Sequence, residues 1–206
     1  MRKIYALLLL FLSISIYGQY SRNSEDRGRF GLKAGGIYSS LLSSKYQNNA
    51  NTGFTVGIFH RSKSLMKFSF AGELMYSTFS TTTSFVPPQG NYKESSNFSV
   101  ISYNVLPNFY VHKNVSFQFG LSIGYFLGGS VAEAIPKKNT ADYFIGLSET
   151  ADLPMELAIP VGINYDFSTK VTANLRYQVS VLSPYTISLD EKAKISNLSL
   201  TVGYAF

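Results

Sequence analysis

The stretch Ile195-Ser-Asn-Leu-Ser-Leu-Thr-Val-Gly-Tyr-Ala-Phe206 decides how the rest of the chain is interpreted. Counting back from Phe206, every second residue is apolar or aromatic, and the residues between them are small or polar. A period of two predicts a β-strand with two unlike faces. The same alternation recurs along the chain, which indicates an all-β protein.

The pattern predicts eight strands joined by connections of two kinds. The expected strands cover residues 30–38, 52–61, 67–81, 98–111, 115–127, 155–167, 171–182 and 195–206. Short connections at 62–64, 112–114 and 168–170 alternate strictly with long ones at 39–51, 84–97, 128–153 and 183–194. This asymmetry is typical of membrane barrels, which have short periplasmic turns and long outer loops. Pro107 lacks the N–H that a closed sheet needs, and we expect a β-bulge there.

The composition favours a barrel in lipid over a water-soluble one. Aromatic residues make up 15% of the chain and charged residues another 15%, with 16 Gly. Few soluble domains hide so many aromatic side chains with so few charges, whereas a barrel in lipid exposes them. The small, Gly-rich faces fit a narrow lumen. We predict an all-β, eight-stranded antiparallel up-and-down transmembrane β-barrel over residues 30–206.

The amino-terminal segment predicts export. A basic start, an apolar run from Ile4 to Ile16 and a small residue at Gly18 are typical of a signal peptide over residues 1–18. The apolar run is shorter than the ~20 residues that a membrane anchor needs. Residues 19–29 are polar, and we expect a periplasmic lead-in there. The sequence has no Cys, hence no disulfide framework, and the dispersed basic residues behind its net charge of +6 argue against nucleic acid as a partner.

Four motifs along the chain resemble a known family. They are Gly31-Leu-Lys-Ala-Gly35, Gly72-Glu-Leu-Met-Tyr-Ser77, Tyr103-Asn-Val-Leu-Pro107 and Leu175-Arg-Tyr177. In that order they resemble the recurring strand motifs of the PorT-like outer-membrane β-barrel proteins. The resemblance implies the Gram-negative outer membrane, with its lipid and lipopolysaccharide as surroundings. It also suggests other envelope or secretion proteins as partners, because the founding member is linked to protein secretion.

The last strand resembles the terminal signal strand of outer-membrane barrels. In such proteins the barrel-assembly machinery recognises the terminal strand, which then pairs with the first strand to close the cylinder. Phe206 and Tyr204 are the residues of this chain that match the signal. We therefore expect the assembly machinery to be a partner.

Two motifs suggest catalysis, and both fit a structural role better. Gly120-Leu-Ser-Ile-Gly124 has the nucleophile-elbow spacing, but that motif needs a strand, a sharp turn and a helix, and here it lies within one expected strand. His60-Arg-Ser62 resembles the His-x-Ser pair of the outer-membrane lipid A deacylases, yet we expect His60 at the periplasmic end, as an interfacial residue. Two separated His and no Cys leave little basis for a zinc site. We predict no enzyme, no cofactor and no metal; a lipid-modifying enzyme is the alternative.

Four long polar residues are expected to face the lumen at similar heights. They are Lys33, Glu73, Gln118 and Arg176, one on every second expected strand. Buried charges are normally paired, so we predict that this polar layer plugs the lumen and that Glu73 and Arg176 meet across it. The protein would then act as a structural, accessory or binding protein through its outer loops, above all the 128–153 loop. A gated ion path, and hence a small ion channel, is the alternative for the layer.

Overall fold

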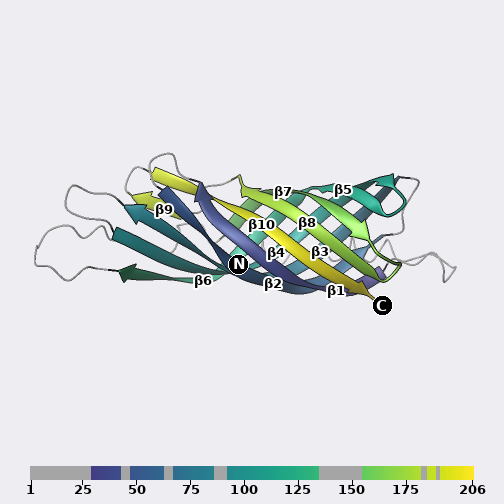
Figure 1. Ribbon diagram of the computed structural model, residues 1–206, viewed down its shortest axis with the longest axis horizontal. Helices are drawn as coiled ribbons and strands as arrows, with labels where there is room; N and C mark the ends of the chain where they lie inside the picture. The colour runs from purple at the N-terminus through teal and green to yellow at the C-terminus, as the bar shows by residue number, and fades with distance from the viewer. Residues whose placement is uncertain are drawn as a thin grey trace, which may run out of the picture.

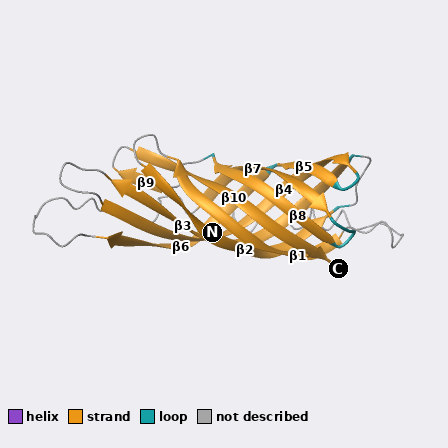
Figure 2. Cartoon of the chain, viewed as in Figure 1, coloured by secondary structure: helices purple, strands orange, loops and turns teal. Residues whose placement is uncertain are grey.

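The computed structural model describes residues 29–42, 47–62, 67–85, 92–134, 155–181, 185–188 and 191–206, and they form ten strands (Figure 2). Within these ranges no helix is long and apolar enough to span a membrane. The strands are β1 (Arg29–Leu42), β2 (Gln47–Arg61), β3 (Phe68–Phe85), β4 (Tyr92–His112), β5 (Val115–Phe119), β6 (Leu121–Ala134), β7 (Met155–Asp166), β8 (Val171–Ser180), β9 (Tyr185–Ser188) and β10 (Glu191–Ala205).

Nine of these strands close into an antiparallel ring (Figure 1). The ring runs β1-β2-β3-β4, then β5 and β6, then β7-β8-β10, and β10 pairs with β1. Because β5 and β6 follow one another and both lie between β4 and β7, they occupy one position, so the ring has eight positions. The predicted eight-stranded up-and-down barrel is confirmed. β9 lies outside the ring, paired with the start of β10, and the sequence did not predict it.

The first and last strands close the cylinder along most of their length. Their register runs from Gly31 opposite Ala205 to Leu42 opposite Lys194. Beyond it, the Phe206 N–H donates to the Phe30 carbonyl at 2.9 Å. The period-two stretch at the end of the sequence is therefore the closing strand of the barrel.

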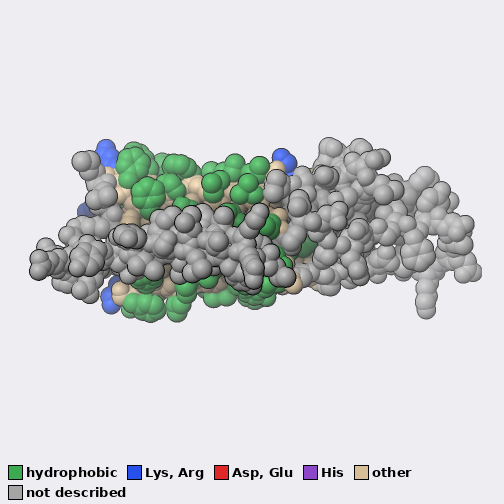
Figure 3. All heavy atoms as spheres, turned by 180° about the vertical axis from the view of Figure 1, so that it is seen from behind, with side chains coloured by type: hydrophobic (Ala, Val, Ile, Leu, Met, Phe, Trp, Pro, Cys, Tyr) green, Lys and Arg blue, Asp and Glu red, His purple; other side chains and the backbone are tan. Residues whose placement is uncertain are grey.

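Apolar side chains form a band on the outer face of the ring, one side of which is seen in Figure 3. Exposed aromatic residues mark both edges of the band. At the short-turn end these are Phe30, Phe68, Phe117, Phe167, Tyr204 and Phe206, and toward the other end Tyr38, Phe54, Tyr125 and Tyr177. Between them most of the exposed side chains are aliphatic, such as Val56, Leu175 and Leu200. An apolar band with aromatic edges is the surface that a barrel presents to a bilayer.

Several strands are longer than predicted and continue into the expected long loops. β3 runs to Phe85, β4 begins at Tyr92 and β6 reaches Ala134, so much of 84–97 and part of 128–153 is paired strand. The 21 residues of β4 reach about 50 Å along the barrel axis at ~3.4 Å per residue and a ~40° tilt, against an apolar band of ~25 Å. The apolar alternation stops where the lipid stops, but backbone pairing continues into water. Hydrophobic periodicity therefore predicted these strands to be shorter than they are.

The bulge predicted at Pro107 is wrong. Phe70 pairs with Pro107 without a register shift, and on the other side Leu106 lies opposite Gly120 and Pro107 opposite Phe119 in an unchanged register. Instead the ladder is interrupted at Gly120, between β5 and β6. The Gly120 N–H donates to the Pro160 carbonyl at 3.1 Å, but Pro160 has no N–H to return the bond. The missing donor interrupts the ladder without moving the strands.

Candidate functional site: the polar lumen

The ring geometry brings the four predicted layer residues to one level of the lumen. Lys33 lies on β1, Glu73 on β3, Gln118 on β5 and Arg176 on β8, which are alternate positions of the ring. β1 therefore faces β5, and β3 faces β8. Each side chain has inward parity on its strand, and none is more than 7% exposed.

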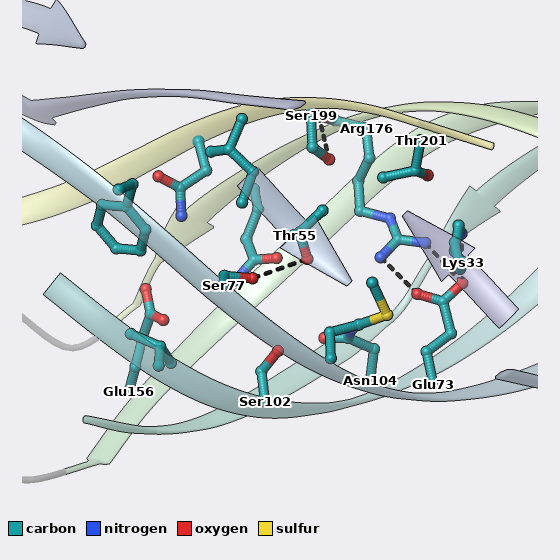
Figure 4. A pocket seen from close by; sticks show the side chains of 16 residues that line it. Lys33, Thr55, Glu73, Ser77, Ser102, Asn104, Glu156, Arg176, Ser199 and Thr201 are labelled. Carbon is teal, nitrogen blue, oxygen red and sulfur yellow. Dashed lines mark hydrogen bonds and ion pairs between the residues drawn. The ribbon is translucent and has the colours of Figure 1, made fainter. Parts of the chain in front are cut away.

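Glu73 is the centre of the charged part of this layer (Figure 4). Arg176 forms a bidentate pair with it, with Nη1 2.8 Å from Oε2 and Nη2 3.0 Å from Oε1. Lys33 Nζ lies 2.6 Å from Oε1 of the same carboxylate. One buried carboxylate thus holds two cations from two other strands. Charge-assisted and bidentate pairs of this kind are the strong hydrogen bonds of a protein interior.

Gln118 links the charged residues to a layer of asparagines nearer the short turns. Its Oε1 accepts from Arg176 Nη2 at 2.8 Å and from Asn174 Nδ2 at 2.8 Å. Its Nε2 donates to Asn108 Oδ1 at 3.1 Å, which also accepts from Asn164 at 3.2 Å. The network therefore extends around most of the ring, and each link fixes its neighbour.

A small cavity lies beside the charged layer. It has a volume of about 40 Å³, room for a few water molecules but not for a ligand. Lys33, Glu73 and Arg176 line it at one end, and Glu156 lies away from them at the other (Figure 4). Glu156 is 3% exposed and accepts a hydrogen bond from the Ser180 hydroxyl. When Glu156 is counted with Lys33, Glu73 and Arg176, the formal charges of the residues that line the cavity sum to zero.

An apolar cluster fills part of the lumen farther from the short turns. It consists of Ile37, Leu41, Phe79, Val100 and Ile195, with Phe98 and Phe126 packed against them. These residues come from β1, β3, β4, β6 and β10 and have the inward parity of their strands. The lumen is therefore layered, with amides and charges at one level and packed hydrocarbon at another.

The structure also locates the residues of the two catalytic motifs. Ser122 is fully buried, with its hydroxyl 3.4 Å from the Gln178 amide nitrogen, and no helix follows it. His60 is half-buried, with its ring centroid 4.5 Å from that of Phe30 at the aromatic edge. Its neighbour Arg61 pairs with Asp166 at 2.8 Å. The Ser62 hydroxyl accepts a hydrogen bond from the Phe70 N–H at 2.9 Å.

Residues 11–183 match the family described as "Outer membrane protein beta-barrel domain". The chain belongs to this family. It is therefore a protein of the outer membrane, and its apolar band suits a bilayer. The match does not point to the PorT-like proteins in particular, which the strand motifs of this chain resemble.

Solved structures of small outer-membrane barrels are similar to this one. The attachment invasion locus protein Ail of Yersinia pestis shares 16% identity, over 87% of this chain and 99% of its own, with a TM-score of 0.49. OprG of Pseudomonas aeruginosa shares 13%, over 87% and 96%, with a TM-score of 0.48. The Neisserial surface protein NspA shares 15%, over 86% and 97%, with a TM-score of 0.47. No curated protein matches the chain significantly in sequence.

Sequence reasoning missed two features of this outer-membrane barrel's lumen. Glu156 has the same parity as Gly162 and Asn164, which was the available signal, but its strand was interpreted from its apolar face alone. The apolar cluster was missed because Ile37 and Phe79 interrupt faces that are otherwise small or polar. A lumen was expected to be polar throughout, and a narrow one is packed like any protein core.

Proposed function

We propose that this outer-membrane barrel has a plugged lumen and acts through its long connections, as a structural, accessory or binding protein. The observation that carries the proposal is the contact of Arg176 and Lys33 with Glu73 across the lumen. An ion moving through the barrel would have to break these buried pairs. It would also have to pass the apolar cluster, which water does not readily wet.

The same geometry disfavours the alternative of a lipid-modifying enzyme. A hydrolase needs a nucleophile within hydrogen-bond reach of a base at a place that the substrate can enter. Ser122 is fully buried on the lumen-facing side of its strand, and His60 packs against Phe30 at the short-turn end. The most polar part of the described structure is enclosed, which suits support of the wall rather than chemistry on a lipid.

The long connections are then the part left for recognition, because loops on a rigid scaffold commonly carry function. The longest expected loop, 128–153, lies largely outside the described residues. The resemblance of the strand motifs to PorT-like proteins adds a link to protein secretion as part of the proposal. Partners would be other proteins of the envelope.

Two experiments test the two halves of the proposal. In planar bilayers the purified protein should show no steady conductance, while a general porin treated in the same way conducts; an open channel in the unaltered protein would overturn the plug. Replacing residues 135–154 with a short Gly-Ser linker should remove co-purifying envelope proteins, while the same replacement of 86–91 tests whether the effect is specific. Unchanged co-purification in the first variant, with folding verified by heat-dependent gel mobility, would overturn recognition through this loop.

A further inference from the structure

Two cationic side chains flank the end of the closing strand at the short-turn rim. The Ala205 N–H donates to the Lys170 carbonyl at 2.7 Å, and the Phe206 N–H donates to the Phe30 carbonyl at 2.9 Å. β10 therefore ends between Lys170 on one side and the start of β1 on the other. The Arg29 guanidinium donates to the carbonyl of Thr169, the residue before Lys170. This contact brings the Arg29 side chain across the end of the seam.

The same place carries lipid-facing aromatic rings. Tyr204, Phe206 and Phe30 are 48%, 73% and 50% exposed on the outer face of the barrel. Lys170 Nζ lies 5.9 Å from the centroid of the Tyr204 ring, within cation–π range. The ammonium group is therefore held beside the edge of the apolar band. We call Arg29, Phe30, Lys170, Tyr204 and Phe206 the seam patch.

The positive charge of this rim is little compensated among the described residues. Arg29, Lys67, Lys113 and Lys170 are all exposed at this end. The acidic groups of the described residues here are Asp166, which is engaged by Arg61 at 2.8 Å and by the Tyr110 hydroxyl at 3.3 Å, and the α-carboxylate of Phe206, so the four exposed cations outnumber them. Lys and Arg side chains lie at the edge of the apolar band (Figure 3). A ligand of this rim should therefore be anionic.

We propose that the seam patch binds an anionic glycerophospholipid of the surrounding membrane. The headgroup phosphate would lie between Arg29 and Lys170, because guanidinium and ammonium groups are the usual partners of phosphate. The acyl chains would pack along Phe30, Tyr204 and the aliphatic side chains beyond them. A soluble anion would contact the cationic groups but not the adjoining apolar surface. A lipid would contact both the cationic groups and the apolar surface, and this combination favours a lipid over a peptide or a free ion.

The absence of Trp from the sequence allows a direct test. The full chain carrying Tyr204→Trp is reconstituted into phosphatidylcholine vesicles in which either phosphatidylglycerol or phosphatidylcholine is brominated, and quenching of the single indole reports which lipid contacts it. At low salt the relative affinity for phosphatidylglycerol should exceed that for phosphatidylcholine by roughly tenfold, as expected for two nearby cations. Phe30→Trp serves as a second reporter if the first variant folds poorly. Tyr38→Trp, at the far end of the same seam, is the matched control and should show no preference.

Charge variants decide whether the seam patch is responsible. Arg29→Gln with Lys170→Gln should bring the preference at position 204 close to one, while Arg29→Lys with Lys170→Arg should retain it. An equal preference at positions 204 and 38, or one that survives the neutral variants, would overturn the proposal. So would loss of the preference on adding inorganic phosphate at constant ionic strength, because that result indicates a free-anion site. Stronger displacement of phosphatidylglycerol by lipid A would likewise overturn the choice of a glycerophospholipid.

Discussion

Arg176 and Glu73 form a bidentate ion pair across the full width of the barrel. Arg176 Nη1 lies 2.8 Å from Glu73 Oε2, and Nη2 lies 3.0 Å from Oε1, although their strands β8 and β3 occupy opposite positions of the ring. Lys33 shares the same carboxylate at 2.6 Å. The three residues are therefore not equivalent. Loss of Glu73 leaves two buried cations unpaired, whereas loss of Arg176 leaves Lys33 and Glu73 still paired.

The first prediction follows from this asymmetry. Glu73→Gln should lower the free energy of unfolding by about 3–5 kcal/mol, the usual cost of leaving a buried charge without its partner. Arg176→Met should cost less, because Lys33 still neutralises Glu73. Urea unfolding of the unaltered protein and of the two variants, in the same detergent, measures which change lowers the free energy of unfolding more. A larger loss from Arg176→Met than from Glu73→Gln would contradict the shared-carboxylate arrangement.

The double variant provides the control. Glu73→Gln combined with Arg176→Met should destabilise the barrel by less than the sum of the single changes, with a coupling of ~1 kcal/mol or more. Lys33 remains unpaired in the double variant, so adding Lys33→Met should recover stability. Strictly additive effects would mean that the residues face water or other partners, and the plugged lumen would have to be abandoned.

The second prediction concerns the apolar cluster. Phe79 is 4% exposed in the lumen, while Phe54 is 53% exposed on the lipid-facing side. Phe79→Ala should cost about 3–5 kcal/mol of unfolding free energy, because it leaves a cavity among side chains that cannot collapse fully. Phe54→Ala should cost less, because detergent chains fill the vacated space. Equal losses in urea unfolding would mean that the lumen is not packed around Phe79.

The strand order and the inward-facing residues could be predicted from the alternation of residue types along each strand. In a barrel the side chains of each strand alternate between lipid and lumen. Apolar residues directly precede or follow Lys33, Glu73 and Arg176 in the sequence and take the lipid face, so these three must face inward. Their common height follows from their similar distances from the short turns. The ring order follows because strands that are neighbours in the sequence pair with each other in an up-and-down barrel. The alternation of short and long connections distinguishes the two ends of the barrel.

Other features depend on contacts between strands that no single segment records. The interruption at Gly120 arises because Pro160 on β7 lies opposite it, so neither strand alone predicts it. β9 is a short strand paired with β10 beyond the apolar band, where alternation is no longer a guide. The cluster around Phe79 and Ile37 collects side chains from five strands. For this apolar cluster, sequence reasoning gives the face of each residue, but not which inward residues meet.

The third prediction concerns the closing strand. Phe206 extends the seam through its N–H bond to the Phe30 carbonyl at 2.9 Å, and it resembles the recognition residue for assembly. Deleting Phe206 should reduce the amount of folded protein in the outer membrane, while the predicted signal peptide should still be processed. Phe167→Ala is the control, because Phe167 is also an exposed aromatic of this rim but lies outside the closing strand. Unchanged folded levels after the deletion would exclude the proposed role of the terminus.

The fourth prediction concerns orientation, and the absence of Cys makes it simple to test. Single cysteines at Ser44, Gln89, Lys138 and Glu191 should react with an impermeant thiol reagent on intact cells. A cysteine at Thr169, in the short turn after β7, should react only after the outer membrane is opened. The expectation rests on the rule that long connections of such barrels face outward. Labelling at Thr169 alone would invert the barrel in the membrane.

The last prediction concerns the close approach of β4 to Gly120, the residue at the interruption between β5 and β6. A Cβ atom at Gly120 would lie 2.0 Å from the Val105 carbonyl oxygen, a distance that only backbone movement can relieve. Gly36 is the matched control, because the nearest atom to its added Cβ would be 4.0 Å away. Gly120→Ala should lower the free energy of unfolding by about 1–3 kcal/mol, the usual cost of overpacking, and Gly36→Ala should change it little. An unchanged unfolding concentration of urea for Gly120→Ala would contradict this prediction, because the close approach of β4 to Gly120 would then be relieved without cost.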